Sequence, residues 1–200
     1  MDDDRTVVSG DVWIADGVIT RVGPTPPGTP PADREIAAGG GYLLPGFIQT
    51  HVHLCQTLFR GLADDLPLLE WLKQRVWPLE AAHTPATLAA SARLAVHELL
   101  RTGTTTVQTM ETVHDTDAVL EANAPTGHRA TARAAGRGRR RRRPSGTCRP
   151  WRAGIDASVD LHRRWHGQAA GRIRIALAPR FAVSCSRTLL EAVAAESAAR

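Results

Sequence analysis

The sequence predicts an α/β fold, and three stretches carry that prediction. An apolar run from Leu43 to Ile48 has the length and composition of a short buried strand. Residues 84–103 are typical of a helix, and the β-branched residues 104–110 after them are typical of a strand. Residues 155–166 and 173–177 repeat this order of helix and strand. Helices that alternate with strands indicate a parallel sheet covered by helices.

Composition narrows the classes of protein to which the chain can belong. The first residues, MDDDR, are acidic and no later apolar run could span a bilayer, so we expect neither a signal peptide nor a membrane anchor. The three cysteines, Cys55, Cys148 and Cys185, lack paired spacing, which favours a reducing cytoplasm over a disulfide framework. The formal charge is +5, but residues 123–150 hold nine arginines and no acid. Without them, 25 − 9 = 16 basic residues face 20 acidic ones, a net charge of −4.

The amino-terminal residues predict a β-hairpin. Residues 12–15 and 18–22 are β-formers on either side of Asp16-Gly17, a pair that readily takes the positive φ angles of a type I′ turn. A second β-rich piece is expected near Arg34 to Ala37, after a loop rich in proline and glycine. Taken alone, the hairpin pattern predicts structure only and indicates no function.

Two histidines stand at the carboxyl end of the predicted apolar strand. His51 and His53 have one residue between them, and because side chains alternate along a strand, both imidazoles point to one face. Two neutral imidazole nitrogens about 2.0–2.1 Å from one cation are half of a tetrahedral zinc shell. His-x-His by itself is a weak signal, and the alternative is an ordinary pair of hydrogen-bonded histidines.

The context of these histidines resembles the amidohydrolase superfamily. The Pro45-Gly46 entry, the strand with His51 and His53, and the continuation Leu58-Phe59-Arg60-Gly61 are similar to its cytosine/guanine/adenosine-type deaminases and triazine hydrolases over about forty residues. The resemblance implies a small β-sandwich piece in residues 1–43. It also implies that residues 44–200 form about strands 1–4 of a (β/α)8 barrel, since a complete barrel needs roughly 250 residues.

The same resemblance implies a site. His51 and His53 would ligate one divalent metal ion, zinc or alternatively iron, while the remaining ligands and the acid/base glutamate are expected beyond these 200 residues. Gln56, Trp71 and Glu80 match positions that line the substrate pocket in purine or adenosyl-type deaminases. Arg180 resembles the arginine that faces the purine at the fourth barrel strand of guanine-type deaminases, and Glu111, at the end of the strand 104–110, is a further candidate pocket residue. Each has a plainer alternative, such as a solvated amide, a core indole or a surface ion pair. Relatives often carry an acid at the position of Thr109, and His114 is expected in an exposed loop.

Helix signals follow the histidines. Asp64 and Asp65 are expected to cap a helix with Pro67 in its first turn, and Pro78 is expected to break the apolar stripe that follows. Thr84-Pro85 starts the next helix, and Gly103 ends it. Near the carboxyl end, Ser184-Cys185-Ser186 is expected to cap a helix from residue 187 onward.

The arginine-rich segment 123–150 departs from this order. It lacks periodicity and large apolar residues, so its composition predicts no buried strand, although the resemblance calls for a third barrel strand there. A compensated frameshift in the GC-rich gene is one explanation, which resequencing codons 120–152 would test. A nucleic-acid-binding arm is the alternative, since the run Arg139 to Arg143 would release counterions from phosphates. No Phe, Tyr or Trp is interleaved for base stacking, which argues against that function.

By this resemblance we expect a metal-dependent hydrolase acting on C–N bonds other than peptide bonds, one that deaminates a purine, a nucleoside or a related heterocycle. The alternatives are hydrolysis of an s-triazine and a catalytically inactive fragment. The expected partners are a small heterocyclic substrate and water, with no membrane and no nucleic acid. Four barrel strands leave an open edge, so we also expect a homo-oligomeric or insoluble chain.

Overall fold

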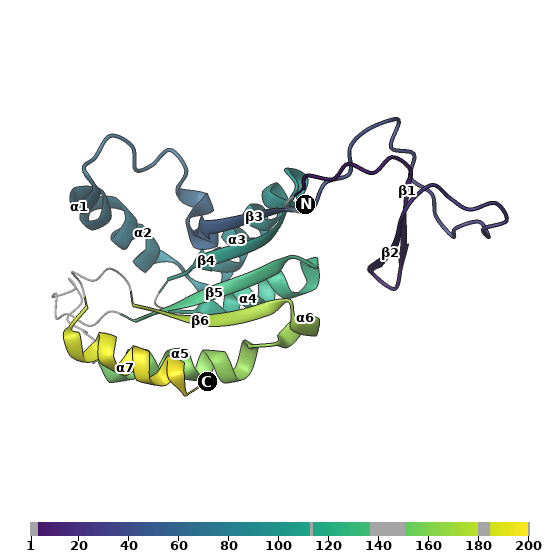
Figure 1. Cartoon of the computed structure of the whole chain (residues 1–200). Coiled ribbons are helices and arrows are strands. Elements are labelled where there is room, and N and C mark those ends of the chain that lie inside the picture. Colours follow the sequence, from purple (N-terminus) through teal and green to yellow (C-terminus); the bar gives the residue numbers. More distant parts are fainter. Residues whose placement is uncertain (1–3, 113, 137–150, 180–184, 200) are drawn as a thin grey trace. The chain divides into compact units, whose positions relative to one another are not determined.

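A computed structural model describes residues 4–112, 114–136, 151–179 and 185–199 (Figure 1). The chain divides into two compact units, residues 1–45 and 46–200. The resemblance to the amidohydrolase superfamily implied this division between residues 43 and 44.

The amino-terminal unit contains a β-hairpin. Strands β1 (Asp11–Ala15) and β2 (Val18–Gly23) pair antiparallel, and Asp16 and Gly17 between them have φ angles of 51° and 75°, as the type I′ turn requires. The hairpin prediction is confirmed. The prediction of a β-rich piece at residues 34–37 is wrong, because these residues are exposed and form no strand. So short a stretch is not held in a strand without a partner to supply a ladder of hydrogen bonds.

The second unit is built on a parallel sheet. Its strands are β3 (Phe47–Val52), β4 (Thr104–Met110), β5 (Arg129–Gly136) and β6 (Ile173–Pro179), in the order β3-β4-β5-β6. All three pairings are parallel, and each strand lies beside the one that precedes it in the chain. This sheet, with helices in its crossovers, confirms the expected first part of a (β/α)8 barrel.

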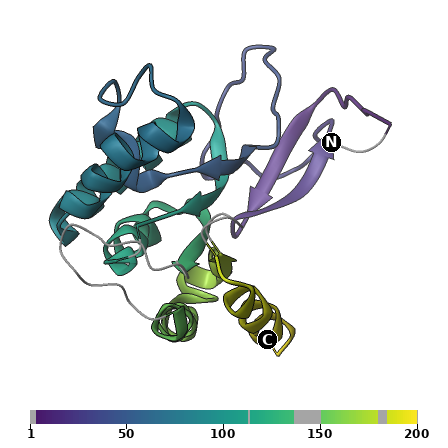
Figure 2. The same cartoon turned by 90° about the vertical axis from the view of Figure 1, so that its left-hand side faces the viewer.

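The crossover helices cover the sheet (Figures 1 and 2). They are α3 (Pro85–Arg101), α4 (Thr116–Asn123) and α5 (Trp151–Trp165), with the shorter η3 (Ala124–Thr126) and α6 (Gln168–Gly171), and α7 (Arg187–Ala198) follows β6. Thr84 caps α3 through a capping box with Thr87, and Ser186 caps α7, as predicted. The sequence patterns did not predict α4.

Two apolar clusters fix these helices in place. The first joins the turn after β3 to α3 and α4, with Leu54, Leu88 and Val96 almost completely buried. The second joins α4 and α5 to β5 and β6, through Leu120, Leu161, Ile173 and other residues. The second cluster lies between helices and the sheet, as in a layered α/β domain, and the first reaches the sheet through the partly buried Val52 of β3.

The segment between β3 and α3 corrects two predictions. It consists of η1 (Leu54–Phe59), α1 (Leu68–Trp71), the π-helical η2 (Leu72–Val76) and α2 (Trp77–Ala82). Pro67 itself is the N-cap of α1 and no side chain caps it, so the predicted capping by Asp64 and Asp65 is wrong. Pro78 also does not end the helix. The wide π turn before it shifts the hydrogen-bond register by one residue, which accommodates the proline's missing N–H.

Strand β5 corrects the prediction that the arginine-rich segment contains no buried strand. Arg129–Gly136 pairs on both sides, with β4 and with β6. Ala130 and Ala132 are buried while Arg129 is exposed, so alanine is large enough to fill the inward positions. The ladder bonds come from the backbone and need no large apolar side chain. Arg139 to Arg143 and Cys148 lie outside the described residues.

Strand β3 is an edge of the sheet in the part of the chain that the structure describes. It begins at Phe47 rather than at Leu43, so the apolar run and the strand overlap only in part. Phe47 and Ile48 are 61% and 68% exposed. The carboxyl end of β3, by contrast, continues into η1, which packs against α2 and α3, and His53, Gln56 and Trp71 gather here.

Candidate metal and substrate site

His51 and His53 lie at the carboxyl end of β3. His51 is the fifth residue of the strand and is exposed, while His53 is half-buried and immediately follows the strand as the N-cap of η1. Their ring centroids are 5.2 Å apart and the ring planes are nearly perpendicular. The carboxyl end of β3 therefore brings the two imidazoles into edge-to-face contact.

The His53 ring is oriented by a backbone carbonyl. Its Nδ1 lies 2.7 Å from the Met110 oxygen at the end of β4, and since a carbonyl only accepts, Nδ1 carries the proton and donates it. In the neutral imidazole, Nε2 then holds the lone pair. Metal-ligating histidines characteristically donate their second nitrogen in this way, so His53 fits a divalent ion.

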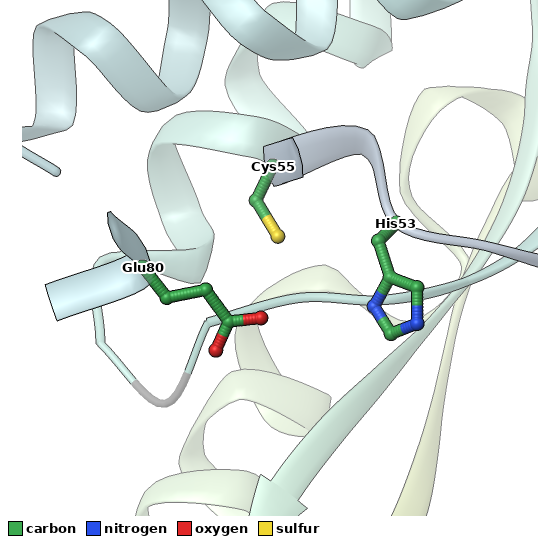
Figure 3. Close-up of side chains that lie close together, drawn as sticks. All are labelled: His53, Cys55 and Glu80. Carbon is green, nitrogen blue, oxygen red and sulfur yellow. The ribbon is translucent and has the colours of Figure 1, made fainter. Parts of the chain in front are cut away.

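Cys55 and Glu80 lie toward the Nδ1 edge of the same imidazole (Figure 3). His53, Cys55 and Glu80 each place a possible ligand atom within 4.8 Å of the others (Figure 3). Cys55 is fully buried and Glu80 is 4% exposed. Sequence reasoning missed Cys55 as a site residue, because a single cysteine without a spaced partner carries no ligand signal.

Glu111 lies beneath this turn, completely buried. Its Oε2 accepts a hydrogen bond from the Cys55 backbone N–H at 3.0 Å, and its Oε1 accepts one from the Thr109 hydroxyl. Burial raises the pKa of the Glu111 carboxyl, while the hydrogen bonds from Thr109 and Cys55 act in the opposite direction. Both carboxyl oxygens are therefore engaged with the protein itself.

The carbonyl groups of the turn are bonded as well. The Ser91 hydroxyl of α3 donates to the Leu54 oxygen at 2.7 Å. His83, at the end of α2, donates from Nε2 to the Cys55 oxygen at 2.7 Å. The peptide groups after His53 are thus held from both sides, as buried backbone polar groups need to be.

A cavity of about 380 Å³ opens beside His53. Its lining includes Gln56 and Trp71, and the Gln56 amide donates to the Glu80 carboxylate at 2.8 Å. Four residues singled out from the sequence are thus connected here: His53, Gln56 and Trp71 line the wall, and Glu80 is hydrogen-bonded to Gln56. Glu111 does not line this cavity.

The predictions for Arg180 and His114 have different outcomes. Arg180 lies outside the described residues, so its predicted place in the pocket stays a prediction. His114 lies in the loop after β4, as expected, but it is half-buried rather than exposed: its side chain is 26% exposed, and its Nε2 lies 3.1 Å from the Glu80 carbonyl oxygen. The site is therefore tied to the loop after β4 through Glu80.

Comparison with known sequences gives one family. The sequence model described as the amidohydrolase family matches residues 42–200. The 5-methylthioadenosine/S-adenosylhomocysteine deaminase of Desulforudis audaxviator is 37% identical over 191 residues, which cover 94% of this chain and 42% of that protein. The 5'-deoxyadenosine deaminase of Methanothermobacter thermautotrophicus is 37% identical over 187 residues, covering 93% of this chain and 42% of that protein. The chain thus spans about two-fifths of the length of these relatives.

Solved structures agree on the fold. A guanine deaminase from C. acetobutylicum with bound guanine superposes with a TM-score of 0.77 at 20% identity, covering 94% of this chain and 45% of that one, which supports the fold alone. An adenosine deaminase from Xanthomonas campestris with bound zinc superposes with a TM-score of 0.65 at 30% identity, covering 77% and 34%.

Among the described helices, none has the length and apolarity needed to cross a membrane.

The family assignment rests on the sequence comparisons, and the fold is consistent with it. The matched sequence model spans most of the chain, and the parallel sheet is the one expected from the histidine motif. We conclude that this chain belongs to the amidohydrolase family.

Proposed function

We propose that this chain is the amino-terminal part of a metal-dependent aminohydrolase that removes the exocyclic amine of an adenine nucleoside. One observation carries the proposal: His53, Gln56 and Trp71 line a single cavity of about 380 Å³ at the carboxyl end of the first strand of the parallel sheet. Active sites of barrel enzymes lie at this end of the strands. The deaminase relatives that are 37% identical favour an adenine nucleoside over other heterocycles.

We assign His51 and His53 as ligands of one divalent ion, with zinc preferred and iron as the alternative. When bound, such an ion supplies an activated water as nucleophile, because it lowers the pKa of that water towards about 7. The hydrogen bond from His53 Nδ1 to the Met110 oxygen supports this role, since it places the proton on Nδ1 and the lone pair on Nε2. Cys55 and Glu80 are the competing donor set around the same ring.

The lining of the cavity suggests which residues contact the substrate. Trp71 offers an aromatic face to a planar base, and Gln56 with Glu80 forms a polar pair suited to hydroxyl groups of a sugar. For Arg180 we keep the predicted role of hydrogen-bonding the heterocycle. In the overall reaction, water adds to the ring carbon that bears the amine, the C–N bond breaks, and ammonia leaves.

Metal binding by the 200-residue chain is the first test. Zinc affinity is measured by competition with a chromophoric chelator in the parent, in H51N, in H53N and in C55S. We expect the two histidine variants to lose binding while C55S keeps it. H97N, a change at an exposed histidine of α3, is the matched control. Loss of zinc binding in C55S with retention in H51N would instead assign the metal to the group of His53, Cys55 and Glu80.

Activity is tested in a chimera. Residues 1–200 are fused to the part of the Desulforudis audaxviator deaminase that they do not match, and ammonia release is followed with S-adenosylhomocysteine, 5'-deoxyadenosine, adenosine and guanine. We expect release from the adenine nucleosides and none in the H51N chimera. An active H51N chimera would contradict the assignment.

An s-triazine substrate is the second candidate. A zinc-bound atrazine chlorohydrolase from Arthrobacter aurescens shares the fold, with a TM-score of 0.68 at 24% identity, and the same activated water could displace chloride. Chloride release from atrazine by the chimera, without ammonia release from nucleosides, would favour it. An inactive chimera that still binds zinc would favour the inactive-fragment alternative.

A further inference from the structure

The end of β4 and the turn after β3 are joined residue by residue. The Leu54 N–H donates to the Thr109 hydroxyl oxygen at 3.3 Å. The His53 Nδ1–H donates to the Met110 oxygen at 2.7 Å, and the Cys55 N–H donates to Glu111 Oε2 at 3.0 Å. Three consecutive residues at one strand end thus accept from three consecutive residues that follow the neighbouring strand. We call residues 109–111 the β4 clamp.

Glu111 completes this clamp in two directions. Besides accepting from Cys55, it accepts from the hydroxyl of Thr109, which in turn accepts from Leu54. The carboxylate therefore sets the rotamer of the Thr109 hydroxyl and the direction of the Cys55 N–H together. The Met110 carbonyl lies between these two fixed residues in the chain, so the acceptor of the His53 ring cannot turn independently of them.

We propose that Glu111 is a positioning residue that holds the turn 53–55 against β4 and thereby fixes the orientation of the His53 ring. The inference rests on the proposed function in one respect, namely that His53 is a metal ligand. Orientation by a carboxylate or carbonyl behind the ligand decides how well an imidazole meets its ion.

A direct role in substrate binding is less compatible with the geometry. Glu111 is 0% exposed, does not line the cavity, and has both oxygens occupied by partners within the protein. A purely structural role in a distant core is also a poor description, because each of its partners belongs to the clamp or to the turn that it holds. A carboxyl is kept in so buried a place only when hydrogen bonds compensate it.

The test uses the metal-free 200-residue chain and three variants. E111L removes both acceptors at nearly constant volume, and E111Q keeps one oxygen acceptor. N123L is the matched control, because Asn123 is equally buried and hydrogen-bonds to His128, at the opposite end of the sheet near the start of β5. Three quantities are measured: hydrogen-exchange protection of the Leu54 and Cys55 amides, the His53 tautomer by ¹⁵N NMR, and zinc affinity by chelator competition.

In E111L we expect at least about a tenfold fall in protection of the Cys55 amide and loss of the single Nδ1–H tautomer of His53. Zinc affinity should fall about tenfold, the lower end of the loss that follows when the hydrogen bonding behind a ligand is disturbed. E111Q should restore most of the protection. N123L should lower global stability but leave the His53 tautomer and the relative protection of residues 54 and 55 as in the parent.

Unchanged protection and tautomer in E111L would overturn the proposal, and so would equal losses in E111L and N123L, because the effect would then be global. If E111L does not fold, T109V replaces it; it removes the acceptor of Leu54, and its loss of Leu54 protection is decisive in the same way. If the parent binds no zinc while the amides and the tautomer respond to E111L, the metal assignment fails and the positioning of His53 by Glu111 stands.

Discussion

Replacing His83 by phenylalanine removes two hydrogen bonds of the imidazole, one to the Cys55 carbonyl beneath the site and one to the Thr87 hydroxyl. His83 is 9% exposed, and its Nε2 donates to the Cys55 carbonyl at 2.7 Å while its Nδ1 lies 2.9 Å from the Thr87 hydroxyl. Its ring also packs on Phe59, with 4.8 Å between the ring centroids. A phenylalanine at position 83 keeps the ring contact and loses the donor. The Cys55 carbonyl is then left without this partner in a buried place.

The expected loss in the free energy of unfolding follows from the hydrogen bond that the Cys55 carbonyl loses. A buried polar group that loses its partner costs about 1–3 kcal/mol. With a urea slope of about 2 kcal/mol/M, the midpoint of unfolding should fall by roughly 0.5–1.5 M. The loss of the Thr87 contact adds little, because the Thr87 hydroxyl can also donate to the Thr84 carbonyl at 3.1 Å.

Urea unfolding, followed by far-UV circular dichroism and tryptophan fluorescence, measures this midpoint in the parent, in H83F and in H97F. His97 is exposed on α3, so H97F controls for the change of residue type and should shift the unfolding free energy by less than about 0.5 kcal/mol. A midpoint for H83F that matches the parent, or a shift equal to that of H97F, would refute the reasoning that the Cys55 carbonyl depends on His83.

Three further predictions concern pH, self-association and close packing. Burial lowers the pKa of His128, so the folded chain favours the neutral imidazole. The stability that His128 contributes is therefore complete above the ordinary pKa of 6.5 and is lost as the pH drops through the lower folded-state pKa. In H128Q the urea midpoint should depend less on pH between about pH 7.5 and 5 than it does in the parent. An identical pH profile in both chains would contradict this. Ile48 is 68% exposed on the edge strand β3, and I48K should reduce self-association in sedimentation velocity without changing the circular dichroism; the same association in parent and variant would argue against this edge as the contact. A Cβ on Gly46 would lie 2.2 Å from the Thr105 Oγ1, so G46A should cost about 1–3 kcal/mol in urea unfolding and T105G should relieve most of it; a G46A chain as stable as the parent would disprove the clash.

The local elements of this fold were readable from the sequence because their signals lie within a few residues. Thr84-Pro85 and Gly103 bound α3, and the β-branched run between Thr104 and Met110 is β4 itself. Asp16-Gly17 determines the hairpin in the same way. Each of these depends on backbone preferences and capping bonds that neighbouring residues supply, so no knowledge of the distant chain is needed.

Hydrogen-bond partners outside the local sequence determine the other elements. Pro78 remains helical because a π turn precedes it, and Arg129–Gly136 is a strand because β4 and β6 flank it. Composition alone gave the opposite expectation in both cases, since it cannot report hydrogen bonds that come from elsewhere in the fold.

The residues of the candidate site fall into the same two groups: those predicted from the sequence and those brought to the site by long-range contacts. The sequence by itself placed His51 and His53 at the carboxyl end of one strand, and the family motif predicted that Gln56, Trp71 and Glu80 lie near them. Only the tertiary structure brought Glu111 under the turn of His53, because the bond from the Cys55 N–H to its carboxylate joins residues 56 positions apart. A contact of that kind has no local signal, since it arises only when two parallel strands place their carboxyl ends side by side.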